Sequence, residues 1–282
     1  MTSLQALLFA AIQGITELFP ISSLGHAVVI PRLFGWTVDQ QSPSFLPFLV
    51  VLHVGTAVAL LAYFWRDWIG FFRAILGALP VAEVKSQRRL LGMLIIGTIP
   101  AVIVGFALEH ALRSLFGSPS IAATFLIVNG IVLFIGERLR TRDIKTEHLR
   151  ALDDVDAVDA LIIGICQCAA LIPGISRSGA TMVGGLLRGL SHAAAAHFSF
   201  LLATPIIAGA AVLEVPKLLR HGTESGMTTL ALLAGMVAGV TAWLSVFILM
   251  RYFKRREFEA LDPFAYYCIA FGAAALVALS FS

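Results

Sequence analysis

Charged side chains are scarce in this chain. Only 13% of its 282 residues are Asp, Glu, Lys or Arg, whereas 59% are hydrophobic and the mean hydropathy is +0.90. Soluble domains carry about 25% charged and about 45–50% apolar residues. The deficit excludes disordered, collagen-like and coiled-coil chains, and it leaves too few polar residues to coat a soluble enzyme. The composition therefore predicts an all-α polytopic membrane protein.

The sequence also lacks a high net charge, a CxxC motif and a signal peptide. The net charge is only +3 and the basic residues are clustered between apolar runs, so we expect no nucleic acid partner. Cys166, Cys168 and Cys268 form no CxxC pair, and we interpret them as small packing residues. The first residues lack the basic region and the cleavage site of a signal peptide, so we expect them to belong to the mature fold.

Six apolar segments are long enough to cross a bilayer, which takes about 20 helical residues. They run approximately over residues 45–65, 90–108, 119–137, 195–216, 228–250 and 263–281. Two further apolar regions are interrupted, at 19–23 and at 173–179, by prolines and serines. Each half is too short to span, and a serine can cap a new helix after a proline break. We interpret both regions as re-entrant helix–turn–helix hairpins.

The two hairpins match each other. Gln13 precedes Gly25 by 12 residues, as Gln167 precedes Gly179, and each hairpin is followed by three spans. The match predicts an internal duplication. The predicted parts of a single integral membrane domain, residues 1–282, are repeat one over about 1–140, a cytoplasmic loop over about 138–155, and repeat two over about 156–282.

Lysine and arginine predict the orientation. The segments 66–89, 138–150 and 251–256 hold 14 of these 20 residues, and the other connections between spans hold four. The positive-inside rule makes the three rich segments cytoplasmic. Both termini are then periplasmic, the two hairpins enter from opposite sides, and the repeats have inverted topology with their tips near the midplane. We interpret the four aspartates at 153–159 as a solvated face, and 66–89 as an interfacial anchor.

Polar side chains gather at the two hairpin tips. Glu17 alone among the acidic residues lies well inside an apolar segment, and Arg177 is the matching basic residue at the other break. A charge at the bilayer centre costs about 2.5–3.5 kcal/mol, so each needs a partner or a wet cavity. Gln13 shares a helix face with Glu17, and a helix that starts near Ser176 offers free N–H groups to an anion. The remaining polar candidates at the tips are Ser22, Ser23, His26, Ser178 and Thr181.

These groups suit chemistry on a phosphate inside a membrane. A serine, an imidazole and a carboxylate beside an anion site supply a nucleophile, a proton carrier and charge stabilisation. The alternative, a purely structural ion pair between Glu17 and Arg177, stays open. We interpret His53 and His197 as packing histidines, and we expect Arg188 to snorkel to a membrane surface.

Two segments resemble a known family. The 14 residues from Gln13 to His26 read QGITELFPISSLGH. They resemble the (E/Q)xxxE region and the following SSxGH of bacterial undecaprenyl-diphosphate phosphatases, the bacitracin-resistance protein family. The nine residues from Pro173 to Thr181 read PGISRSGAT and resemble the PGxSRSxxT motif of that family. The similarity covers essentially the whole chain. Gln13 stands where many members carry Glu, which weakens a metal role for that position.

The resemblance implies hydrolysis of undecaprenyl diphosphate to undecaprenyl phosphate and inorganic phosphate in the bacterial inner membrane. This reaction recycles the lipid carrier for peptidoglycan synthesis and confers bacitracin resistance. The resemblance also implies a divalent cation, Mg²⁺ or Ca²⁺, and a site open to the periplasm. It matches Ser23 to a nucleophile, His26 to a general acid/base, Glu17 to an activating or metal-binding carboxylate, and Arg177 to a diphosphate clamp. The substrate-binding candidates are Gln13, Ser22, Gln167, Ser176, Ser178 and Thr181.

Other functions stay open at this point. Inverted repeats with broken helices also suit a secondary transporter or a polyprenyl-phosphate flippase. An acid-phosphatase-type lipid phosphatase is disfavoured, because its Lys/Arg-rich motif and second catalytic histidine do not follow at suitable spacing. The sequence does not decide between Ser23 and an activated water as the attacking group. Membrane lipids are expected partners, and the oligomeric state is open, a homodimer included.

Overall fold

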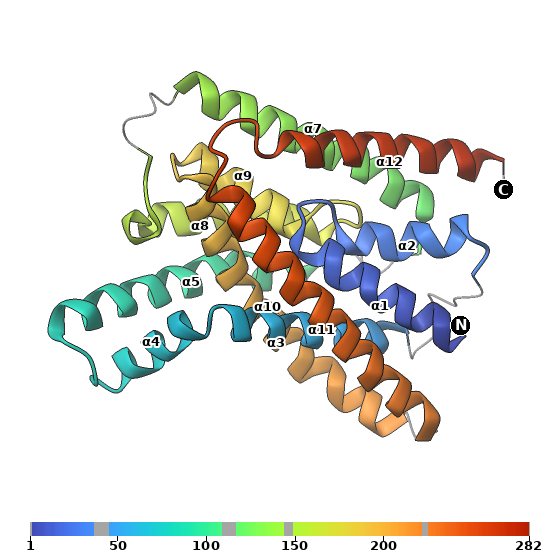
Figure 1. The fold of residues 1–282 in the computed structure, drawn as a ribbon, viewed down its shortest axis with the longest axis horizontal. Coiled ribbons are helices and arrows are strands. Elements are labelled where there is room, and N and C mark those ends of the chain that lie inside the picture. Colours follow the sequence, from blue (N-terminus) through green and yellow to red (C-terminus); the bar gives the residue numbers. More distant parts are fainter. Residues whose placement is uncertain (1, 37–44, 109–116, 144–148, 222–224, 282) are drawn as a thin grey trace.

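The computed structural model describes residues 2–36, 45–108, 117–143, 149–221 and 225–281. Regular structure in these ranges is helical, apart from one isolated bridge between Arg150 and Leu190. The elements are α1 (Ser3–Leu18), α2 (Ser23–Leu33), α3 (Phe45–Tyr63), α4 (Trp65–Ile75), α5 (Val81–Ala107), α7 (Pro119–Asp143), η2 (Leu152–Asp154), α8 (Ala157–Cys168), η3 (Ala169–Leu171), α9 (Arg177–Leu187), α10 (His192–His221), α11 (Ser225–Phe253) and α12 (Asp262–Ser280) (Figure 1).

The long helices correspond to the predicted spans. In the described residues α5, α7, α10, α11 and α12 are each long and apolar enough to cross a membrane. A sixth span arises if α3 and α4 are counted together, although the chain bends by 77° between them. The bend separates apolar α3 from amphipathic α4, which buries Phe71 and exposes Trp65 and Phe72. The prediction of a polytopic helical membrane protein is confirmed.

Both interrupted regions form pairs of short helices. Helices α1 and α2 have 16 and 11 residues, and α8 and α9 have 12 and 11. At about 1.5 Å per residue, none of them reaches across a hydrocarbon core of about 30 Å. A serine caps the second helix of each pair: Ser22 Oγ accepts from Gly25 N at 3.2 Å, and Ser176 Oγ accepts from Gly179 N at 3.1 Å. The helix–turn–helix form and its serine caps were predicted.

Small residues let the short helices pack closely against the long ones. A Cβ added to Gly14 of α1 would overlap the Ala238 carbonyl oxygen of α11. At the second tip Gly174 has a φ of +103°, and a Cβ there would overlap the Ala122 carbonyl oxygen of α7. Close backbone approach through small residues is typical of helix packing in membranes. The first hairpin therefore packs closely against α11, and the tip of the second packs closely against α7.

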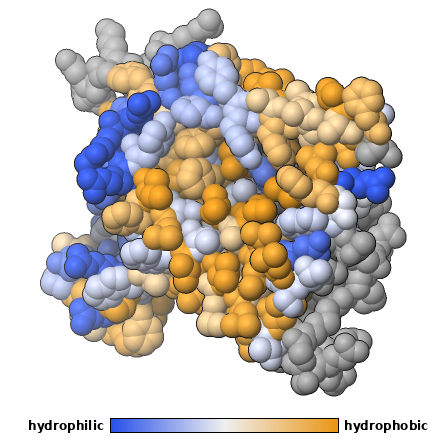
Figure 2. All heavy atoms as spheres, turned by 45° about the vertical axis from the view of Figure 1, so that its right-hand side comes forward, coloured by the Kyte–Doolittle hydropathy of each residue, from blue (hydrophilic) through white to orange (hydrophobic). Residues whose placement is uncertain are grey.

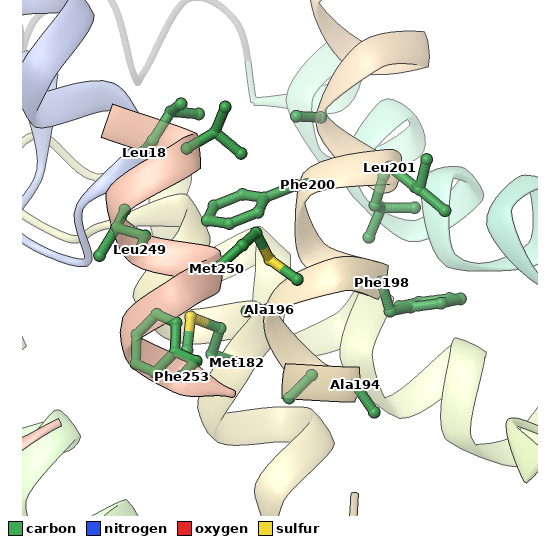
Figure 3. Close-up of a cluster of buried hydrophobic side chains, with 14 of the residues drawn as sticks. Leu18, Met182, Ala194, Ala196, Phe198, Phe200, Leu201, Leu249, Met250 and Phe253 are labelled. Atoms are coloured by element: carbon green, nitrogen blue, oxygen red, sulfur yellow. The ribbon is translucent and has the colours of Figure 1, made fainter. Parts of the chain in front are cut away.

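The largest apolar cluster lies where α9, α10 and α11 meet (Figure 3). Phe198 and Phe200 of α10 are fully buried in it, together with Phe253 of α11 and Met182 of α9. Leu18, the last residue of α1, packs into the same cluster. Such close packing holds membrane helices together through van der Waals contacts. The end of the first hairpin is thus fixed against helices from the second half of the chain.

The two ends of the molecule differ. The start of α1 and the end of α12 lie at the right-hand end of Figure 1, and the ends of α4, α7 and α11 lie toward the opposite end. The three segments rich in lysine and arginine, 66–89, 138–150 and 251–256, contain the ends of α4, α7 and α11. Figure 2 shows hydrophilic residues along one edge of the face in view and hydrophobic ones across its middle. The predicted basic segments therefore share one end of the molecule.

Asp159 and Arg188 correct two interpretations of the sequence. Asp159 is completely buried, and it is not part of a solvated face. Its carboxylate accepts from Arg150 Nη2 at 2.5 Å and from Arg188 Nε at 2.7 Å, so Arg188 does not simply snorkel. Burial alone would raise the pKa of Asp159, but hydrogen bonds from Arg150, the Asp156 backbone and Arg188 lower it to about 2. This clamp ties the start of α8 to the end of α9.

Candidate functional site

The two hairpin tips meet at an ion pair. Glu17 lies in the last turn of α1, and Arg177 is the first residue of α9. Arg177 Nη2 is 3.3 Å from Glu17 Oε1, and both side chains are largely buried. Arg177 Nη1 also donates to the Ser199 carbonyl of α10 at 3.2 Å. Each buried charge is therefore partnered, as the cost of an isolated charge in a membrane requires.

Three polar side chains lie close to the second carboxylate oxygen of Glu17, Oε2. Ser23 Oγ donates to Glu17 Oε2 at 2.5 Å, and Gln13 Nε2 donates to the same oxygen at 3.0 Å. His53 Nε2 lies 3.2 Å from it. Ser23 begins α2, so the turn between α1 and α2 directs the hydroxyl back onto the carboxylate. A short hydrogen bond between a hydroxyl and a carboxylate is the arrangement of a nucleophile with its base.

The interpretation of His53 as a packing residue was wrong. His53 lies in the middle of α3, and its Nδ1 donates to the Leu49 carbonyl at 2.8 Å. Its Nε2 therefore faces the cluster, 3.0 Å from Gln13 Nε2 and 3.2 Å from Glu17 Oε2. His197, by contrast, lies 3.2 Å from Asp67 and stacks on an aromatic ring. The usable signal for His53 was an ionisable residue within an apolar span, which marks a functional site by default.

His26 has its hydrogen bonds elsewhere than at Ser23, for which the resemblance predicts it as the general acid/base. Its Nδ1 is 2.7 Å from the Ser22 carbonyl oxygen, and its Nε2 is 2.8 Å from Tyr267 Oη of α12. Ser23 Oγ donates to Glu17 instead. In this arrangement the carboxylate of Glu17, and not the imidazole of His26, accepts the hydrogen bond of the Ser23 hydroxyl.

Asn129 joins the tips from the side. This α7 residue is 1% exposed, and its Nδ2 donates to the Pro20 carbonyl of the first tip at 3.0 Å. Its Oδ1 accepts from Ser176 N of the second tip at 2.9 Å. One amide therefore satisfies a backbone acceptor of one turn and a backbone donor of the other. Asn129 was not among the predicted site residues, although it is a polar residue in the middle of the 119–137 segment.

The serines and threonine of the second tip bind mainly to their surroundings. Ser178 Oγ donates to the Phe19 carbonyl of the first tip at 3.2 Å and contacts Ser176 Oγ at 3.0 Å. Thr181 Oγ1 contacts Ser199 Oγ at 2.7 Å. These candidates, like Ser22, contribute caps and cross-links that hold the tips in place.

Gln167 is the candidate that the structure leaves outside the cluster. Its Nε2 donates to the Gly97 carbonyl of α5 at 3.4 Å. Its Oε1 is buried and has no hydrogen-bond partner in the described residues, and the same is true of Gln13 Oε1. The two matching glutamines thus have different neighbours, and only Gln13 contacts Glu17.

A narrow crevice between α1 and α2 leads to the cluster. It is lined by Phe9, Ile12, Gln13, Ser23, His26, Ala27 and Ile30. The polar residues of this lining belong to the cluster, and the apolar ones continue from it along both helices. The arrangement places a buried hydroxyl, the carboxylate that accepts its hydrogen bond and a guanidinium beside apolar side chains, which suits an anionic head group on an apolar chain.

Comparison with known proteins agrees with this chemistry. The sequence matches the family described as "Bacitracin resistance protein BacA" over residues 6–274. The Undecaprenyl-diphosphatase of Granulibacter bethesdensis is 55% identical, over 100% of this chain and 98% of its own. The protein of the same name from Acidiphilium cryptum is 56% identical, over 100% and 99%. Undecaprenyl-diphosphatase 2 of Oenococcus oeni is 42% identical, over 96% and 97%.

Proposed function

This chain belongs to the bacitracin resistance protein BacA family and hydrolyses undecaprenyl diphosphate, and we propose that Glu17, Ser23 and Arg177 form its active site. The observation that carries the proposal is the 2.5 Å hydrogen bond from Ser23 Oγ to Glu17 Oε2, with Arg177 on the other carboxylate oxygen. The products are undecaprenyl phosphate and inorganic phosphate.

Ser23 is the nucleophile in this mechanism. Its oxygen attacks the terminal phosphorus while its proton passes to Glu17 Oε2, to which it already donates. A bond forms between Ser23 Oγ and phosphorus, and the bond from phosphorus to the bridging oxygen breaks, so undecaprenyl phosphate leaves. Water then hydrolyses the phosphoserine: its oxygen bonds to phosphorus as the bond from phosphorus to Ser23 Oγ breaks, Glu17 returns its proton to Ser23, and the protons of the water stay with the released phosphate. The net reaction consumes one water and releases inorganic phosphate.

Arg177 binds the diphosphate that is being cleaved. Its planar guanidinium suits phosphate oxygens, and the free N–H groups at the start of α9 favour an anion at the same place. In the structure described here Arg177 pairs with Glu17 and with the Ser199 carbonyl. The bound diphosphate takes over part of this pairing, so the guanidinium stabilises charge that develops on the phosphoryl group.

The cluster also fits a divalent cation that the substrate helps to bind. Glu17 carries a carboxylate, and Gln13 has a buried amide oxygen without a partner in the described residues. The described residues contain no group of three or more His, Cys, Asp or Glu that would bind a metal alone. Mg²⁺ is often bound by one or two carboxylates together with phosphate oxygens of the substrate. A bound cation would neutralise charge on the diphosphate, with Glu17 and Gln13 as its protein ligands.

We further propose that the protein lies in the inner membrane as two inverted repeats, with the site open to the periplasm. The matching hairpins and the three spans after each of them support the duplication. The basic connections, at the end opposite the termini, support the orientation. The first hairpin then enters from the periplasmic side, together with Glu17 and Ser23.

Phosphate release from undecaprenyl diphosphate by the detergent-purified protein tests the proposed site. Ser23→Ala should lower kcat by about a hundredfold or more with normal insertion and thermal stability. Glu17→Gln should lower kcat as much, and it should also lower Tm because Arg177 loses its charged partner. Thr98→Val is the matched control, because Thr98 donates only to its own helix. If Ser23→Ala kept a near-normal kcat, the attacking group would be a water activated by Glu17 and not Ser23. If EDTA abolished phosphate release and added Mg²⁺ or Ca²⁺ restored it, the cation would be supported. A transporter without hydrolase activity would release no phosphate.

A further inference from the structure

The contacts of His26 define its protonation. The Ser22 carbonyl oxygen, 2.7 Å from Nδ1, can only accept a hydrogen bond, so Nδ1 carries a proton. In the neutral ring Nε2 is then an acceptor, and the group 2.8 Å from it is the hydroxyl of Tyr267. Tyr267 therefore donates to Nε2. His26 is 1% exposed, so no solvent competes for either nitrogen.

The rings around His26 hold the imidazole in one plane. His26 stacks on Phe271 with ring centroids 4.8 Å apart and planes 8° apart. Tyr267 lies beside it at 5.7 Å with planes 6° apart. Both aromatic residues come from α12, one helical turn from each other. The Tyr267 ring is 41% exposed, so one edge faces outward while its hydroxyl turns in toward His26.

Helix α12 is itself held in register with the site. At its first residue Asp262 pairs with Arg138 of α7 at 2.7 Å. Beside Tyr267, Cys268 Sγ accepts from Asn129 Nδ2 at 3.3 Å, and Asn129 is the amide that joins the two tips. Asn129 therefore contacts both tips and also the residue next to Tyr267 on α12, so it helps to position Tyr267 relative to the tips.

His26 in turn supports a strained turn. Ser22 has a φ of +67°, which is uncommon for a residue with a side chain and persists only where the surroundings determine it. Its carbonyl accepts from His26 Nδ1, which fixes the peptide immediately before Ser23. That peptide decides where the hydroxyl of Ser23 points, and in the structure it points at Glu17.

We propose that Tyr267 is a positioning residue for the hydrolysis. Its hydroxyl bonds to Nε2 and holds the imidazole ring in place, and the Nδ1–H of that ring holds the Ser22 peptide that aims Ser23 at Glu17. The proposal rests on the site proposed above, because its effect on turnover passes through Ser23. His26 acts in it as a support for the turn.

Nitrogen chemical shifts of isotope-labelled histidine test the first step without any substrate. The purified protein should show His26 with a protonated Nδ1 and an unprotonated Nε2, with the signal assigned by its loss in His26→Asn. Tyr267→Phe removes only the donor to Nε2, so its His26 should keep the proton on Nδ1 while the Nε2 signal shifts as its hydrogen bond is lost. Tyr266→Phe is the matched control: Tyr266 is the neighbour on α12, is 57% exposed, and has no hydrogen-bond partner in the described part of the chain.

Phosphate release by the same samples tests the second step. Tyr267→Phe should lower kcat about tenfold and change KM by less than about twofold, since the loss of one hydrogen bond misplaces Ser23 without touching the diphosphate. Tyr266→Phe should keep both constants. A wild-type His26 protonated at Nε2, or a Tyr267→Phe protein with the wild-type Nε2 chemical shift or the wild-type kcat, would overturn the proposal. A wild-type protein that released no phosphate would refute the proposed function and leave the tautomer result standing.

Discussion

Replacing Asn129 should separate the two tips more effectively than any change within either of them. The Asn129 amide satisfies the Pro20 carbonyl at 3.0 Å and the Ser176 amide at 2.9 Å in a site that is 1% exposed. Asn129→Leu leaves the buried Ser176 amide without a partner and the Pro20 carbonyl with only a long contact of 4.0 Å from Cys268 Sγ. Each such group costs about 1–3 kcal/mol, so we expect a loss of about 2–6 kcal/mol in stability or a local rearrangement that avoids it.

Either response lowers activity. A rearrangement that moves the tips apart by about 1 Å separates Glu17 from Arg177, and misplacement on this scale costs about a hundredfold in rate. Asn129→Asp keeps the acceptor for Ser176 N but sets an oxygen against the Pro20 carbonyl, so it should also be impaired.

The assay combines thermal unfolding in detergent with phosphate release from undecaprenyl diphosphate. Thr124→Val is the control, because Thr124 lies on the same helix and donates only to the Ser120 carbonyl of that helix. If Asn129→Leu retained the wild-type Tm and kcat, Asn129 would not link the tips. The bond from Ser178 to the Phe19 carbonyl would then be sufficient.

Three further predictions concern other charged or exposed positions. Arg177→Lys should lower kcat/KM strongly at unchanged Tm, because lysine keeps the charge and loses the planar fork; wild-type kcat/KM would refute the diphosphate contact. Asp159→Asn should lower Tm near neutral pH, because it removes the carboxylate that pairs with Arg150 and Arg188. Arg188→Ala should lower Tm less, because Arg150 still pairs with Asp159. Because the pKa of Asp159 falls from 3.8 to about 2 in the folded protein, its stabilising effect is present above pH 3.8 and is lost toward pH 2; equal Tm differences at pH 7 and pH 3 would contradict this. In a protein without native cysteines, Ser86→Cys and Ser280→Cys should label from opposite sides of the membrane, and labelling from one side would refute the proposed topology.

Much of the fold follows from hydropathy and helix breakers. Five of the six apolar segments became helices long enough to span, and the sixth became α3, which forms a bent pair with α4. The proline and serine breaks near residues 20 and 175 became turns with serine caps. These features depend on local sequence, because a span needs length and a cap needs one side chain. The pairing of Glu17 with Arg177 was also accessible, since each buried charge needed a partner and each was the charged residue nearest its tip.

The missed residues are those whose partners lie far away in the sequence. His53 meets Glu17 across 36 residues, Asn129 meets Pro20 across 109, and Tyr267 meets His26 across 241. Helix periodicity gives the face of a residue on its own helix, but not which helix packs against that face.

Polar residues inside apolar spans would have been the better guide. In a membrane such a residue needs a hydrogen-bond partner from another segment, because lipid offers none. His53 and Asn129 stand within apolar spans, and both proved to contact the hairpin tips. The same reasoning covers the basic end, where His192 and Glu137 are fully buried and lie 2.8 Å apart. In a chain with so few charged residues, polar side chains within the spans converge on shared sites because each of them has to be satisfied by the others.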